Sequence, residues 1–119
     1  MVAQLHGWLA YATAIVMAIV VLDAGRRAWR RLPRGPLTDR LEAIVLILLL
    51  ITSAGGLGIL IGGSAPAEPL HFLYAVLALG SLPLANSLSR NATARRQALV
   101  TLITAVVAIV LVARLFQTG

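Results

Sequence analysis

Four stretches of the sequence are long enough and apolar enough to cross a lipid bilayer as helices. They cover about residues 5–24, 41–61, 70–88 and 97–116, and a helix needs about 20 apolar residues to span the hydrocarbon core. The chain is 60% hydrophobic and only 12% charged, and a domain of 119 residues cannot hide that much apolar surface from water. The composition therefore excludes a soluble enzyme and a disordered chain, and the absence of cysteine excludes a disulfide scaffold.

The connections between these stretches are short, which favours antiparallel neighbours in an up-down bundle. Pro33 and Pro36 interrupt the first connection, and Pro66 lies in the second. The sequence predicts one domain over residues 1–119, an all-α integral membrane protein folded as an up-down four-transmembrane-helix bundle.

The arginines predict the orientation of this bundle. Nine of the ten lie in residues 25–40 and 89–96, and Arg114 alone lies on the other side. Because basic loops stay in the cytoplasm, both termini should lie outside a cell membrane, of the bacterial or archaeal inner-membrane kind. The basic residues also follow the first apolar run, whereas a signal peptide has them in front, so we expect a retained span. Because the arginines are confined to short loops, they indicate that the binding partner of the protein is a lipid bilayer rather than nucleic acid.

The middle turns of all four stretches contain no Asp, Glu, Lys, Arg or His. Buried ionisable groups are the usual mark of proton-coupled transporters and ion pathways. The length and the four spans resemble the small multidrug resistance transporters, but that family relies on a membrane-embedded Glu in its first helix, and residues 5–24 have none. A small transporter is therefore the weakest of the functional hypotheses. Asp23 and Glu42 lie at helix ends beside arginines, where local pairing explains them.

The two histidines are the strongest candidates for chemistry. His6 opens the first predicted helix and His71 opens the third, so both lie at the outer end, and these helices can face each other across an up-down bundle. Two imidazoles at one depth are what a six-coordinate haem iron needs as axial ligands. Two histidines leave a tetrahedral zinc site short of protein ligands. The lack of cysteine rules out covalent c-type haem.

Small and polar residues at the same depth extend this candidate site. Missing side chains allow a flat macrocycle or another helix to approach a helix backbone closely, and Arg114 would be placed to pair with a haem propionate. The predicted cofactor-binding residues besides the two histidines are Tyr74, Gly55, Gly58, Gly62 and Arg114. The glycines also have a purely structural explanation, because such stripes pack membrane helices together.

The plan resembles that of membrane b-type cytochromes, which hold haem between histidines on bundle helices. This resemblance implies a haem b protein that transfers electrons within a membrane complex and has no independent catalytic activity. A quinone would need only one histidine and a small-residue groove. A cofactor-free accessory subunit of a respiratory or photosynthetic assembly is the alternative, with other membrane subunits or a second copy of the chain as partner.

Overall fold

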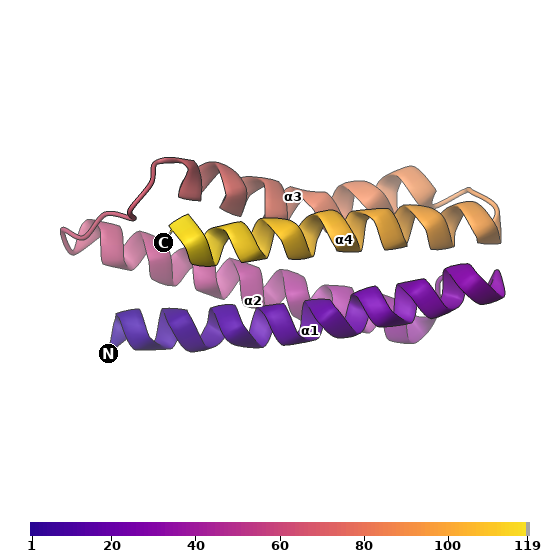
Figure 1. Cartoon of the computed structure of the whole chain (residues 1–119), viewed down its shortest axis with the longest axis horizontal. Helices are drawn as coiled ribbons and strands as arrows, with labels where there is room; N and C mark the ends of the chain where they lie inside the picture. Colours follow the sequence, from indigo (N-terminus) through magenta and orange to yellow (C-terminus); the bar gives the residue numbers. More distant parts are fainter. Residues whose placement is uncertain (119) are drawn as a thin grey trace.

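The computed structural model describes residues 1–118 as four long helices joined by short connections (Figure 1). The helices are α1 (Val2–Arg30), α2 (Pro36–Ile61), α3 (Leu70–Ser89) and α4 (Ala94–Thr118). All four are long and apolar enough to cross a membrane. The predicted all-α transmembrane four-helix bundle is therefore confirmed.

The helices α1, α2 and α4 extend beyond the predicted spans at the arginine-rich end. α1 runs six residues past Ala24, and α2 begins at Pro36 rather than near residue 41. The bundle is 48 Å long, whereas the hydrocarbon core is about 30 Å thick. These additional helical turns hold most of the arginines. The helices therefore extend beyond the apolar segments from which the spans were predicted.

Local signals set the helix ends at this side of the molecule. α1 ends at Arg31, whose φ of 55° is left-handed and whose N–H bonds to the carbonyl of Ala28, as in the usual C-terminal cap. Pro36 occupies the first turn of α2, where its missing N–H costs nothing. The hydroxyl of Thr93 accepts the N–H of Arg96 at the start of α4.

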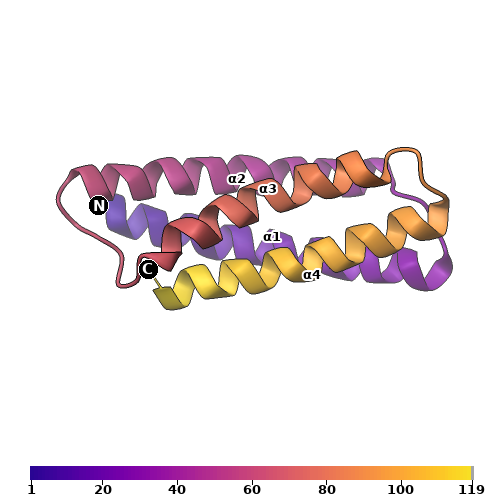
Figure 2. The same ribbon diagram turned by 90° about the horizontal axis from the view of Figure 1, so that it is seen from above.

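The helices form a square in which consecutive helices are antiparallel (Figures 1 and 2). α1 packs along α2 and α4, and α3 packs along α4, while α2 and α3 approach each other over a much smaller area. Within residues 1–118, α1 and α3 lie diagonally across the bundle and do not pack directly. Both chain ends lie at one end of the bundle (Figure 2), which we call the terminal end, and the opposite end is the arginine end.

The core of the bundle is narrow and consists mainly of small and medium side chains. Its middle layer contains Met17, Val45, Leu82, Ala105 and Ala108, all buried. Most other large apolar side chains face outward on every side. A helix that is apolar all round is typical of a membrane span, so this surface is suited to contact with a lipid bilayer.

Candidate functional site

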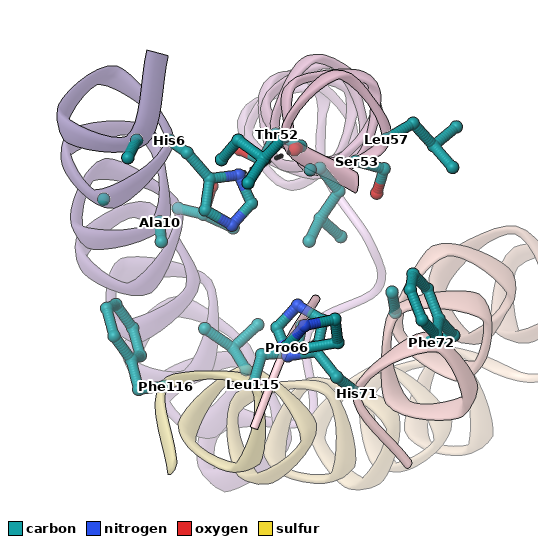
Figure 3. Close-up of a pocket in the computed structure, with 18 of the residues that line it drawn as sticks. His6, Ala10, Thr52, Ser53, Leu57, Pro66, His71, Phe72, Leu115 and Phe116 are labelled. Atoms are coloured by element: carbon teal, nitrogen blue, oxygen red, sulfur yellow. Dashed lines mark hydrogen bonds between the residues drawn. The ribbon is translucent and has the colours of Figure 1, made fainter. Parts of the chain in front are cut away.

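A cavity of about 520 Å³ lies between the four helices toward the terminal end. Its volume is in the range of small-molecule and cofactor sites, about 300–1,000 Å³. The walls are largely apolar, and every helix contributes to them: Ala10 from α1, Leu49 from α2, Ala75 from α3 and Leu115 from α4. The imidazoles of both histidines line the cavity, one from α1 and one from α3 (Figure 3).

His6 is held against α2 by a hydrogen bond. Its Nδ1 lies 2.9 Å from the backbone carbonyl oxygen of Thr52. A carbonyl only accepts, so the neutral imidazole must carry its proton on Nδ1 and donate it. The ring sits close to the backbone of α2, because a Cβ atom on Gly56 would lie 3.3 Å from His6 Cε1. Gly56 therefore makes room for the imidazole.

His71 is held against α4 in the same manner. Its Nδ1 lies 3.2 Å from the hydroxyl oxygen of Thr118, and that hydroxyl donates its own proton to the carbonyl of Arg114 at 2.9 Å. With its only proton committed, the Thr118 oxygen accepts from His71. The backbone carbonyl of Thr118 also accepts the N–H of Glu68, so the connection between α2 and α3 is tied to the end of α4.

Both imidazoles are consequently fixed in the same tautomer, with Nδ1 protonated and Nε2 carrying the lone pair. Metal-ligating histidines show this arrangement, in which the second ring nitrogen donates to a carbonyl or another oxygen and so sets the ring orientation. His6 and His71 point into one cavity from opposite corners of the bundle (Figure 3). The sequence placed these two residues at one depth, and the structure brings them to one site.

None of the other predicted site residues lines the cavity. Among residues 1–118, the cavity lining does not include Tyr74, Gly55, Gly58, Gly62 or Arg114. Gly55 is close to the site, 3.7 Å from His6 Nδ1 when a Cβ is added, whereas Gly58 faces open space and Gly62 caps α2. Arg114 is exposed and donates to Gln117 at 3.0 Å, since its position on α4 points away from the bundle axis.

Four residues at or beside the site were not predicted from the sequence. Gly56 is four residues from Thr52 on the same face of α2. This spacing identifies Gly56 as a neighbour of the His6 ring once His6 is known to bond to Thr52. Thr118 gives no sequence signal, because its role depends on where α4 ends beside the start of α3. Tyr11 and Phe116 form a ring pair with centroids 4.9 Å apart, which closes the joint between α1 and α4.

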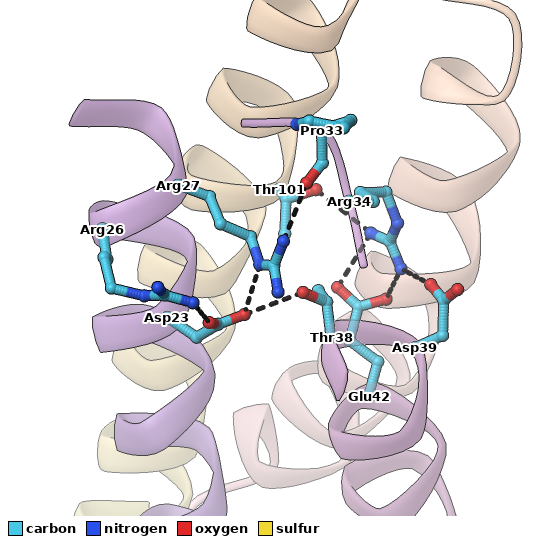
Figure 4. A network of polar contacts seen from close by, with 9 residues as sticks. All are labelled: Asp23, Arg26, Arg27, Pro33, Arg34, Thr38, Asp39, Glu42 and Thr101. Carbon is cyan, nitrogen blue, oxygen red and sulfur yellow. Dashed lines mark hydrogen bonds and ion pairs between the residues drawn. The ribbon is translucent and has the colours of Figure 1, made fainter. Parts of the chain in front are cut away.

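A second group of polar side chains lies at the arginine end (Figure 4). The carboxylate of Asp23 accepts hydrogen bonds from Arg26, from Arg27 and from the buried hydroxyl of Thr38 at 2.8 Å. Arg27 also donates to the carbonyl of Pro33. This group fastens the connection between α1 and α2, and it confirms that Asp23 pairs locally.

Glu42 pairs with Arg34, as expected, but deeper in the protein than a surface pair. Nη1 and Nη2 of the Arg34 guanidinium both donate to the carboxylate of Glu42, and Nη1 also donates to the hydroxyl of Thr101 at 3.1 Å. The side chains of Arg34 and Glu42 are only 10% and 9% exposed. Burial alone would lower the pKa of Arg34, but its bonds and attraction to Glu42 and Asp39 raise that pKa above its ordinary value.

These pairs leave a strong asymmetry of charge along the bundle. The arginine end carries nine arginines and three acids, Asp23, Asp39 and Glu42, so 9 − 3 gives +6. The terminal end carries Arg114 and Glu68, which cancel. All three acids at the arginine end are already paired with arginine, and the uncompensated charge is borne by exposed arginines.

The comparisons leave the function to be argued from the site alone. No family model matches the sequence, and neither a curated protein nor a solved structure shows significant similarity to it. Within residues 1–118, there is no group of three or more His, Cys, Asp or Glu side chains that would hold a bare metal ion. The two-histidine cavity remains the most developed candidate site of the molecule.

Proposed function

We propose that the protein binds haem b with His6 and His71 as axial ligands and transfers electrons within a membrane complex. The observation that carries this proposal is the position of the two histidines, whose Nδ1 atoms bond to the oxygens of Thr52 and Thr118 and whose rings line one shared cavity. A porphyrin supplies four ligands to iron, so two imidazoles complete the coordination. When bound, the haem would supply a one-electron redox centre.

The apolar lining suits the macrocycle but offers no cation to its propionates. Arg114, the candidate for that role, points away from the cavity. In residues 1–118, no arginine lines the cavity, so the carboxylates would have to reach water at the terminal end, near Ser64. Thr52 and Thr118 would act as positioning residues, because they accept the Nδ1–H of the axial imidazoles and fix the ring orientation.

A quinone is less well matched to this site than iron. Its carbonyl oxygens need hydrogen-bond donors, whereas each neutral imidazole presents the lone pair of Nε2 to the cavity. A quinone would require protonated histidines or the reduced quinol with its two hydroxyl groups. The bis-histidine arrangement therefore favours a metal centre.

A reduced-minus-oxidised visible spectrum of purified protein, expressed with ample haem supply, tests the proposal. We expect a bis-histidine b-type spectrum that is lost or converted to high-spin haem in His6→Ala and in His71→Ala. Tyr74→Phe is the matched control, since Tyr74 lies near His71 on α3 but outside the cavity lining. A colourless protein, or a spectrum unchanged in both histidine variants, would overturn the proposal and favour a cofactor-free accessory subunit, to be identified through co-purifying partners.

The orientation of the bundle is part of the same proposal. The bias of nine arginines at the arginine end against one at the terminal end favours a cytoplasmic position for the arginine end, and this orientation would put the two-histidine cavity in the outer half of the membrane. The chain has no cysteine, so single cysteines at Ala65 and Asn91 report the two ends. In intact cells, a membrane-impermeant maleimide should label Ala65→Cys and spare Asn91→Cys, and the reverse labelling would contradict the assignment.

A further inference from the structure

Three of the four joints between neighbouring helices are closed beside the cavity by a specific contact. The hydrogen bond from His6 to Thr52 joins α1 to α2, and the bond from His71 to Thr118 joins α3 to α4. The Tyr11–Phe116 ring pair joins α1 to α4. No side-chain hydrogen bond joins α2 to α3 within residues 1–118, and these two helices also pack least.

The cavity wall on this fourth side consists of side chains that are themselves exposed. Leu57 of α2 and Phe72 of α3 stand on either side of the gap in Figure 3, and Val76, one turn further along α3, is 65% exposed while lining the cavity. The long sides of the bundle are apolar and face lipid in a membrane. The cavity therefore borders the acyl chains at this joint.

The connection between α2 and α3 crosses the end of the cavity that faces water. Ser64, Ala65 and Pro66 of the connection between α2 and α3 line it. This connection is held down where the N–H of Glu68 bonds to the carbonyl of Thr118 at 3.2 Å. A planar apolar molecule that enters the cavity from water has to pass the tethered loop. One that enters from the lipid side passes only apolar side chains.

We infer that the cofactor enters the cavity from the bilayer, between α2 and α3, rather than from water at the terminal end. This inference rests on the proposed function and names the route by which that site is loaded. Haem partitions into lipid because most of its surface is apolar. Within residues 1–118, the α2–α3 joint separates without breaking a hydrogen bond between those helices, whereas the loop must first release the bond from the N–H of Glu68 to the carbonyl of Thr118.

The rate of haem uptake by apoprotein in nanodiscs tests the route. Val76→Trp should lower the initial rate at which the haem absorbance grows by about tenfold or more. Leu84→Trp is the matched control, because Leu84 is 60% exposed on the same helix and does not line the cavity. Ser64→Trp narrows the water-side route. Slow uptake in Ser64→Trp with normal uptake in Val76→Trp would overturn the inference.

A second measurement tests the opening without haem and so separates its failure from that of the proposed function. Ser53 lines the cavity, and Ser53→Cys introduces a single thiol into a cysteine-free chain. A lipid-soluble maleimide should label this thiol faster than a water-soluble one, and added Val76→Trp should slow the lipid-soluble reagent alone. Equal labelling by both reagents, or no effect of Val76→Trp, would contradict the lateral opening whether or not haem binds.

Discussion

The Nδ1 of His71 lies 3.2 Å from the hydroxyl oxygen of Thr118, 47 residues away in the sequence. The Thr118 hydroxyl donates its proton to the carbonyl of Arg114, so the imidazole has to be the donor in its hydrogen bond to Thr118. A single threonine at the end of α4 thereby sets the tautomer of a histidine at the start of α3. The side chain of Thr118 is buried, which shields this bond from competition by water.

If His71 is a haem ligand as proposed, removing the Thr118 hydroxyl should weaken that ligand without removing it. Thr118→Val keeps the shape and deletes the acceptor, and loss of such a partner typically lowers metal affinity about 10- to 100-fold. We expect the haem dissociation constant to rise by that order, with a shift in reduction potential, measured by haem titration and redox titration. Thr118→Ser should restore both values. Equal weakening by Ser and Val would show that Thr118 only fills space.

Gly56 and Gly58 provide a matched pair on α2. A Cβ on Gly56 lies 3.3 Å from His6 Cε1, whereas one on Gly58 meets nothing within 4 Å. Gly56→Ala should displace the imidazole and lower haem affinity at a cost of about 1 kcal/mol or more. Gly58→Ala should leave haem binding unchanged and stabilise the helix by up to about 1 kcal/mol. Haem titration and thermal unfolding in detergent check the pair, and the same haem affinity in both variants would count against the docking of His6.

The pair of Arg34 and Glu42 should matter more for stability than an exposed ion pair. Because both side chains are nearly buried, Arg34→Ala leaves the Glu42 carboxylate without a cation, at a typical cost of about 3–5 kcal/mol. Glu42→Gln should cost less, because Arg34 keeps its ion pair with Asp39. Asp39, which is 64% exposed, is the control, and Asp39→Asn should cost about 0–1 kcal/mol. Unfolding in mixed micelles measures all three. An Arg34→Ala variant as stable as Asp39→Asn would contradict the buried pair.

Arg31 is the one described non-glycine residue with a left-handed backbone, at φ 55°. That conformation strains a residue with a Cβ by about 1–2 kcal/mol, so Arg31→Gly should stabilise the end of α1 by a similar or smaller amount. Arg30→Gly, one residue earlier and inside the helix, removes the same charge but should destabilise by about 1 kcal/mol. If unfolding measurements find Arg30→Gly more stable than Arg31→Gly, the assignment of Arg31 as the left-handed cap of α1 is contradicted.

The parts of the fold that depend on local patterns could be predicted from the sequence. Apolar run lengths gave the four helices, and the positions of His6 and His71 along them placed both residues at one end. What could not be predicted depends on helix rotation and on docking between distant segments. The outward direction of Arg114 and the use of Gly56 rather than Gly58 follow from how α4 and α2 are rotated, and spacing along one helix does not fix that angle.

The buried middle layer of Met17, Val45, Leu82 and Ala105 lies between the two-histidine cavity and the ion pairs at the arginine end. It holds no group that could carry a proton or solvate an ion, and a charge placed at such a depth costs at least about 2.5 kcal/mol. In the proposed haem protein, this layer would separate the redox centre from the ion pairs at the arginine end, so a proton taken up on reduction would come from the terminal side.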